Sequence, residues 1–396
     1  QRQMCIRDRA WSICRNHVHV IAELTEEKGV DELVCSWKAL APSMNWEGVY
    51  HTEALKAPEA GAKVDALVSE LGDDAVSASA DAETDGAVSG NGFNHVTVLL
   101  HETVDMLAAG PGKLIVDCTL GGGGHTEFLL EQGATVWGID RDPDARRAAT
   151  LKLARFGSRF KVLAGNFQDV ESILAQQGVS QVDGLLADLG VSSHQLDTAS
   201  RGFSFREDGP LDMRMDTRAA FSARNLVNEA PEEEIADILW QFGEERASRA
   251  IARAIVKARS LAPITTTAQL ARVVESVLPR KGRQHPGTRT FQALRIAVNG
   301  ELDALDALLD SSVRLLGKGG RMAVITFHSL EDRRVKQFFD LRSRPEIDRP
   351  EWPAPRPNPD YCFRLLSRKP VTAGEEELST NPRSRSAKLR GVEKII

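Results

Sequence analysis

The sequence contains no apolar run long enough to cross a membrane. A spanning helix needs about 18 consecutive apolar residues, and no stretch of the 396 residues approaches that length. The five cysteines are odd in number and scattered, without a CxxC pair, and the nine histidines show no metal-ligand spacing. These absences argue against a membrane protein, a disulfide scaffold and a metal site. They predict a cytoplasmic protein without a bound metal.

A strong charge of one sign is also missing from most of the chain. Residues 1–92 hold 16 acidic and 8 basic residues, whereas the remainder holds 40 acidic and 42 basic residues. Within this near-neutral remainder, windows 280–295 and 383–390 contain basic residues and no acid. Clustered positive charge suits a phosphate-bearing partner, but exposed helix faces explain it equally well.

The pattern along the chain predicts an α/β fold with a doubly wound, parallel-type sheet. Residues 1–92 are expected to be a disordered or non-native N-terminal extension, because 53–92 are rich in Ala, Ser, Gly and acids. From residue 93, strands alternate with helices. We expect a first α/β part at 93–211, a helical insertion at 212–300 and a second α/β part at 301–396. Expected strands are 113–119, 134–140, 159–164, 182–188 and 320–327; expected helices are 125–132, 143–155, 169–177, 231–242, 244–260, 267–278 and 288–308.

A four-glycine turn, Gly121–Gly124, follows the first expected strand. Without Cβ atoms, such a turn lets a ligand approach the backbone. Asp140 ends the next strand, roughly 20 residues on, where nucleotide-binding units place an acid on ribose hydroxyls. A tight turn without a ligand is the alternative. The glycines are contiguous, unlike G-x-G-x-x-G, no Walker-type lysine follows, and Asp117 precedes the turn. This combination favours a cationic adenosine cofactor, S-adenosylmethionine.

Acidic residues also lie at the end of one later expected strand and shortly after the end of another. Asp188 ends the fourth strand, and the carboxyl ends of parallel strands share one edge, so we expect Asp188 beside Asp140. Capping the following turn is its alternative role. The segment Phe327–Asp332 brings His, Ser and two acids to the end of the last strand. A Ser–His–Asp hydrolase is disfavoured, because the sequence has no G-x-S-x-G elbow.

Ten segments together resemble the ribosomal RNA small-subunit methyltransferase H family, also called MraW. Several are long and unusual, and they occur in order over residues 94–396. They are His95–Leu100, Gly121–His125, Ile139–Asp142, Asp188–Ser193, Arg201–Phe205, Gly209–Asp216, Gly243–Arg246, Thr288–Arg295, Phe327–Asp332 and Asn381–Ser386. Gly122 departs from the pattern, because related sequences often carry a larger residue there.

The resemblance implies a Rossmann-like class I methyltransferase with a helical insertion that recognises the substrate. It implies methyl transfer from S-adenosylmethionine to the exocyclic N4 of one cytosine in the decoding region of 16S ribosomal RNA, with the small ribosomal subunit as partner. A homodimer is compatible with it, and the sequence leaves the oligomeric state open. The implied cofactor-binding residues are Gly123, Gly124, His125, Asp140 (ribose), Phe167 (adenine), Asp188 and Gln195.

The chemistry needs a proton acceptor and an RNA-binding surface. Cytosine N4 is a weak nucleophile, so an acceptor beside its hydrogens would stabilise the developing ammonium. We hypothesise that Asp188 is this catalytic residue, although the D/N/S-P-P-Y signature is absent. The target base must leave its stack, and we expect Arg283, Arg289 and Arg295 to hold the RNA. A small-molecule methyltransferase and a non-catalytic RNA-binding factor are the rival hypotheses.

Overall fold

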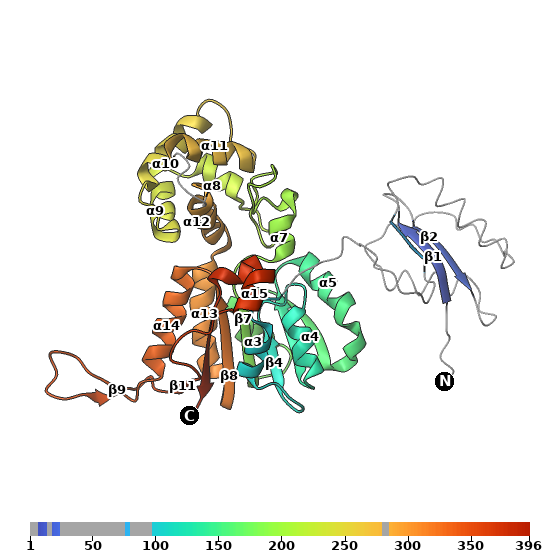
Figure 1. Ribbon diagram of the computed structural model, residues 1–396, viewed down its shortest axis with the longest axis vertical. Helices are drawn as coiled ribbons and strands as arrows, with labels where there is room; N and C mark the ends of the chain where they lie inside the picture. The colour runs from blue at the N-terminus through green and yellow to red at the C-terminus, as the bar shows by residue number, and fades with distance from the viewer. Residues whose placement is uncertain (1–6, 14–17, 24–75, 80–96, 279–284) are drawn as a thin grey trace. The chain divides into compact units, whose positions relative to one another are not determined.

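A computed structural model describes residues 7–13, 18–23, 76–79, 97–278 and 285–396 (Figure 1). The chain divides into two compact units, 1–90 and 91–396. In the first unit, three strands form an antiparallel sheet in the order β2-β1-β3: β1 (Arg7–Ile13), β2 (Val18–Glu23) and β3 (Val76–Ser79). We expected residues 1–92 to be a disordered or non-native extension, but residues 7–13, 18–23 and 76–79 form these paired strands. The rest of residues 1–92 lies outside the described ranges.

The second unit is built on a seven-stranded sheet in the order β11-β12-β8-β7-β4-β5-β6. Its strands are β4 (Leu114–Asp117), β5 (Thr135–Asp140), β6 (Phe160–Ala164), β7 (Val182–Asp188), β8 (Leu316–Thr326), β11 (Phe363–Leu365) and β12 (Lys388–Lys394). Neighbours from β8 to β6 are parallel, which confirms the α/β class. The strands β12 and β11, absent from our prediction, add an antiparallel edge. Their sequences, KLRGVEK and FRL, hold few apolar residues, so they do not have the pattern of a buried strand.

Alternate residues along the central strands enter two separate cores. Val116 and Leu185 face one core, whereas their neighbours Ile115 and Leu186 face the other. Successive side chains of a strand point to opposite faces of the sheet. Both faces of this sheet are therefore covered by a core. The first core is covered by α6 (Val170–Ala175), α13 (Glu301–Leu315) and α14 (Ser329–Arg342), and the second by α3 (Leu100–Leu107), α4 (Gly124–Glu131) and α5 (Pro143–Leu153) (Figure 1).

The helices between β7 and α13 have a hydrophobic core of their own, which extends from Phe203 to Leu294. They are α7 (Ser193–Asp197), α8 (Ala223–Glu229), α9 (Glu232–Gly243), α10 (Ser248–Arg259), α11 (Thr267–Val277) and α12 (Thr288–Asn299). We call α8 to α12 the helical unit. Among the described helices, none is long and apolar enough to cross a bilayer.

The single helix expected at 288–308 is wrong. Gly300 adopts a left-handed conformation (φ 58°) that ends α12 and precedes α13. The first helix therefore packs in the helical unit, whereas Leu305 and Leu308 of the second pack on the sheet. Glycine accommodates this sharp change without a Cβ clash. The short elements α15 (Glu375–Thr380), β9 (Glu346–Ile347) and β10 (Arg356–Pro357) complete the described chain.

Arg201 joins the loop that enters the helical unit to the turn after β5. Its guanidinium donates to Asp142 Oδ2 at 2.9 Å and to the carbonyl oxygens of Met215 at 3.0 Å and Arg214 at 3.1 Å. Both side chains of the Arg201–Asp142 pair are buried, at 9% and 2% exposure. A buried ion pair of this kind is sensitive to loss of one partner, because the remaining charge has no water around it.

We expect Arg201→Met to lower the free energy of unfolding by about 3–5 kcal/mol, since it leaves the Asp142 carboxylate without its cation. Urea denaturation of the variant and the parent protein measures this difference. Arg155→Met is the matched control, because Arg155 pairs with Glu127 and Glu131 at the surface, where about 1 kcal/mol or less is expected. Equal destabilisation by the two substitutions would contradict the role given to Arg201.

Candidate active site

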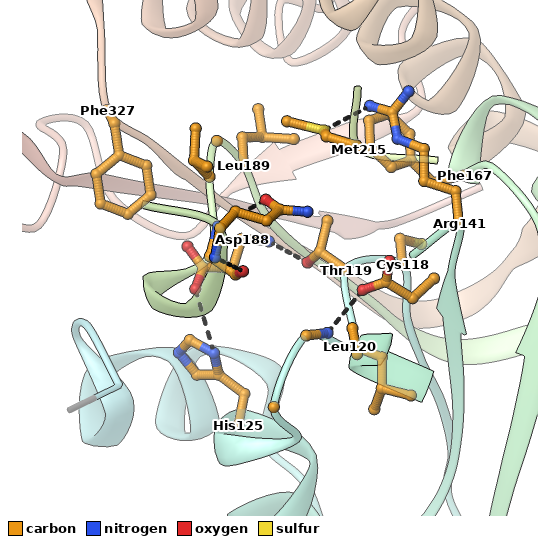
Figure 2. A pocket seen from close by; sticks show the side chains of 18 of the residues that line it. Cys118, Thr119, Leu120, His125, Arg141, Phe167, Asp188, Leu189, Met215 and Phe327 are labelled. Carbon is orange, nitrogen blue, oxygen red and sulfur yellow. Dashed lines mark hydrogen bonds and ion pairs between the residues drawn. The ribbon is translucent and has the colours of Figure 1, made fainter. Parts of the chain in front are cut away.

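The strand order changes direction at β4, and a pocket of the second unit lies at this point. From β4 the chain proceeds to β5 and β6 on one side, and later to β7 and β8 on the other. Crevices for ligands form at such switch points, at the carboxyl ends of the strands. The pocket is lined by residues at or just after five successive strand ends: Gly121, Asp140, Phe167, Asp188 and Phe327 (Figure 2).

The glycine turn lies against this pocket. The Gly121 N–H donates to Asp140 Oδ2 at 2.8 Å, so turn and acid are joined directly. A Cβ at Gly124 would lie 2.0 Å from Thr97 Oγ1, which leaves no room for a side chain. Gly123 is not among the residues that line the pocket, and a Cβ there would meet Leu153, while its contact with the cofactor stays a prediction. Gly121 and Gly122 line the pocket.

Asp117 does not serve as an anion that faces the ligand, as its position before the turn suggested. Its side chain is 2% exposed and accepts hydrogen bonds from Thr126 Oγ1 at 2.7 Å and the Thr119 N–H at 3.0 Å. Burial raises the pKa of Asp117 to about 6. The carboxyl therefore stabilises the segment around the glycines. It binds the Thr119 N–H before them and the Thr126 hydroxyl in the first turn of α4.

Asp140 and Gln195 lie in the pocket and are held by the loop after β5. Asp140 Oδ1 accepts the Asp142 N–H at 2.8 Å, and burial raises the pKa of Asp140. Gln195 donates from Nε2 to Asp142 Oδ2 at 2.9 Å and accepts the Ser192 N–H at 3.1 Å. The sequence analysis missed Asp142, although its position before Pro143 is typical of a helix N-cap.

Asp188 faces His125 across the pocket floor (Figure 2). The two side chains lie 3.6 Å apart, from Asp188 Oδ2 to His125 Nδ1. His125 Nε2 lies 3.0 Å from the Val98 carbonyl oxygen, which only accepts hydrogen bonds, so Nε2 carries a hydrogen. Asp188 Oδ1 is buried without a hydrogen-bond partner. Burial raises the pKa of Asp188 well above its usual value, and the charges of Asp117 and Glu331 raise it further.

The pocket wall beyond Asp188 contains acids that the sequence analysis did not assign. Glu331 accepts the Phe327 N–H at 2.9 Å and the His328 N–H at 3.3 Å. Burial acts to raise its pKa, but the hydrogen bond and charge of His328 and the charge of Arg295 outweigh burial and lower it. Glu301, His328 and Glu331 form the one trio within the described residues that is close enough to hold a metal ion. Arg295 already holds both Glu301 oxygens, each at 2.8 Å, and supplies the positive charge there.

The structure describes two of the three arginines expected to bind RNA, and their surroundings differ. Arg289 is exposed at the start of α12, and one of its nitrogens donates to the Glu244 carbonyl oxygen. Arg295 is a poor phosphate ligand, because its guanidinium is buried in the bidentate pair with Glu301. Arg283 lies outside the described residues. In the second basic window, Lys388 and Arg390 both bind Asp332, so part of this positive charge is balanced within the fold.

Comparison with known proteins agrees with this geometry. Residues 92–395 match the MraW methylase family. The chain belongs to this family. It is 50% identical over 309 residues to a protein of Trichlorobacter lovleyi named ribosomal RNA small subunit methyltransferase H, covering 76% of this chain and 99% of that one. A protein of the same name from Rhodospirillum centenum is 52% identical over 314 residues, with 78% and 95% covered.

A solved structure described as an rRNA methylase from Streptococcus thermophilus covers 76% of this chain and 99% of its own, at 12% identity. Its TM-score of 0.34 is too low to add to the fold argument, which rests on the strand order.

As a methylase of this family, the chain uses S-adenosylmethionine as its methyl donor, and the pocket residues fit that molecule. Asp140 ends β5 at the distance from the turn that suits a ribose, and Phe167 offers an aromatic wall for adenine beyond β6. The unpartnered Asp188 Oδ1 suits a cationic ligand nearby. Individual contacts of Gly123, Gly124, His125, Asp140, Phe167, Asp188 and Gln195 with the cofactor stay predictions, while the position of all but Gly123 around one pocket is observed.

If adenine stacks on Phe167, Phe167→Leu should weaken S-adenosylmethionine binding by roughly 10-fold, the order expected for loss of one stacked base. Calorimetric titration with S-adenosylmethionine measures this affinity. Phe156→Leu is the control, because Phe156 packs in the core around α3 to α5 and does not line the pocket. Unchanged affinity in the Phe167 variant would remove the residue from the cofactor site.

Proposed function

We propose that this chain transfers a methyl group from S-adenosylmethionine to the exocyclic N4 of one cytosine in the decoding region of 16S ribosomal RNA. The name shared by its close relatives supports small-subunit ribosomal RNA as the substrate. The single structural observation that supports an amine as the acceptor is Asp188 Oδ1. This buried oxygen has no hydrogen-bond donor, and an exocyclic amine would supply one.

The donor supplies an electrophilic methyl group on a sulfonium sulfur, and the protein has to present the amine to it. Asp188 Oδ1 accepts an N4 hydrogen and so turns the nitrogen lone pair toward the methyl group. As the N4–carbon bond forms and the sulfur–carbon bond breaks, N4 becomes positively charged. Its proton then passes to the Asp188 carboxylate. Orientation of this kind can contribute about 7–11 kcal/mol to catalysis.

Asp188 must be ionised to act as this acceptor, and the pocket controls its ionisation. Burial and the charges of Asp117 and Glu331 raise its pKa in the protein alone. A positive charge brought into the pocket favours the carboxylate and lowers the pKa again. Since His125 Nδ1 faces Asp188 Oδ2, the imidazole can share the proton that the carboxyl releases or takes up. The active form of Asp188 is therefore favoured when a cationic donor is bound.

We expect Asp188→Asn to lower kcat by roughly 10²-fold, the order associated with loss of one proton-transfer group. The parent rate should rise with pH as Asp188 ionises, and the variant should lose this acidic limb because the amide does not titrate. Steady-state methyl transfer over a pH series measures both effects. Asp169→Asn, the same change at an exposed position, is the control. Normal cofactor binding with full turnover in the Asp188 variant would refute the assignment.

We further propose that the helical insertion, residues 212–300 in our domain division, holds the RNA. Arg289 supports this role, because it is exposed and lies on α12, which leads directly into the pocket wall at Glu301. Arg283 belongs to the same basic window. Phosphate contacts release counterions, so each one adds to the salt dependence of binding. Arg295 is left out of this surface because of its pair with Glu301.

Arg289→Ala should weaken RNA binding and reduce the slope of log affinity against log salt by about 1, and adding Arg283→Ala should reduce it again. Filter binding of small subunits at several salt concentrations measures the slope. Arg314→Ala removes the same charge from α13, where Arg314 pairs with Glu171, and should leave the slope unchanged. An unchanged slope in the Arg289 variant would remove α12 from the RNA surface.

The function as a whole is tested by labelled-methyl transfer to small subunits from a strain that lacks this activity, followed by nucleoside mass spectrometry. N4-methylcytidine is the expected product. Methylation of a small amine alone would favour a small-molecule enzyme, and RNA affinity without transfer would favour a binding factor. Of the described cysteines, Cys118 and Cys362, burial raises the pKa of both thiols, which does not favour a covalent attack on cytosine C5. The cytoplasm, where ribosomal subunits assemble, is the proposed location, and a homodimer stays a prediction.

A further inference from the structure

The pocket has a second aromatic wall that the cofactor does not need. Phe167 follows β6, whereas Phe327 follows β8, and the strands β5, β4 and β7 lie between them in the sheet. Figure 2 shows Phe327 on one side of Asp188 and Leu189, and Phe167 with Arg141 on the opposite side. Both rings line the same pocket. A methyl transfer to RNA brings two bases into one crevice, the adenine of the donor and the target base.

Gly190 lies directly beside the Phe327 ring. A Cβ at position 190 would lie 3.4 Å from ring atom Cδ2 and 4.0 Å from Cε2, which is ordinary contact distance. Gly190 also has a φ of +100°, which strongly favours glycine. The chain from Asp188 to Gly190 therefore passes the ring without a side chain at its nearest point. Asp188 and Phe327 thus line the same pocket, and the backbone that joins Asp188 to Gly190 passes beside the ring.

Glu331 fixes the position of Phe327. It is 2% exposed, and its Oε2 accepts the backbone N–H groups of Phe327 and His328 at the start of α14. The ring itself is only partly buried, although it follows the fully buried strand segment ending at Thr326. A partly exposed aromatic ring on a rigid backbone loses little conformational freedom when a flat ligand stacks on it.

We propose that the Phe327 ring stacks on the target cytosine and holds its amine edge against Asp188. This inference rests on the proposed function. Stacking tolerates any base, because every base has a π face. The distinction between cytosine and uracil then falls to Asp188, since its carboxylate accepts from the N4 amine and repels the O4 carbonyl oxygen of uracil. Phe327 acts as the positioning surface and Asp188 as the selective contact.

The test compares Phe327→Leu, Phe327→Tyr and Phe338→Leu. The leucine variant should lose roughly 10-fold in kcat/KM for small subunits, as expected for one lost stacking contact, while calorimetry shows unchanged affinity for S-adenosylmethionine. The tyrosine variant keeps the ring and should retain activity. Phe338, also on a segment after β8, packs on the core around α13 and α14 away from the pocket, so Phe338→Leu should leave kcat/KM unchanged.

Three results would overturn the inference. An equal fall in cofactor affinity and kcat/KM would place Phe327 on the donor. Full activity of the leucine variant would show that the ring does not hold the base. Equal loss in the tyrosine and leucine variants, with melting temperatures like the parent, would reduce Phe327 to a packing residue. If the parent protein does not methylate small subunits, the proposed function itself fails and the inference falls with it.

Discussion

The cost of burying negative charge organises this site. Acids lie at or just after the ends of β4, β5, β7 and β8, and each must be compensated within the fold. Asp117 and Asp140 accept backbone N–H groups of their own turns, and Glu331 accepts two at the start of α14. Asp188 is the exception: one oxygen faces His125 at 3.6 Å and the other has no partner. The acid with the least compensation is thus the one left to interact with a ligand.

Hydrogen bonds join the helical unit to the segments that line the pocket. Asn299, the last residue of α12, donates to the Met213 carbonyl oxygen and accepts the Met215 N–H, both at 2.8 Å. Arg141, next to Asp140, donates to the Asn299 carbonyl oxygen at 2.9 Å. Met215 and Glu301 both line the pocket. These hydrogen bonds fix the helical unit relative to the ends of the strands. A substrate bound by the helical unit is therefore held beside the pocket.

Sequence reasoning predicted the strands and their terminal acids because both leave a local signal. The strands from β4 to β7 are apolar runs with an acid at the end of β4, β5 and β7, so Asp140 and Asp188 could be placed at one edge. The direction of a side chain leaves no such signal, which is why Asp117 was misread. Arg295 was misread for a related reason: its partner Glu301 lies beyond Gly300, and the two meet only because the chain breaks the helix there. Glu331 acts through backbone N–H groups, which composition does not reveal.

Burial itself favours the proposed reaction. Asp188 enters it as a carboxylate beside a sulfonium charge and ends it as a neutral carboxyl beside a neutral sulfide. Two charges thus disappear from a site that burial makes unfavourable for charge. The same burial that raises the pKa of Asp188 makes proton uptake after methylation favourable, since the product pocket no longer holds a cation to stabilise the carboxylate. The poor solvation of Asp188 thus favours the loss of both charges in the proposed reaction.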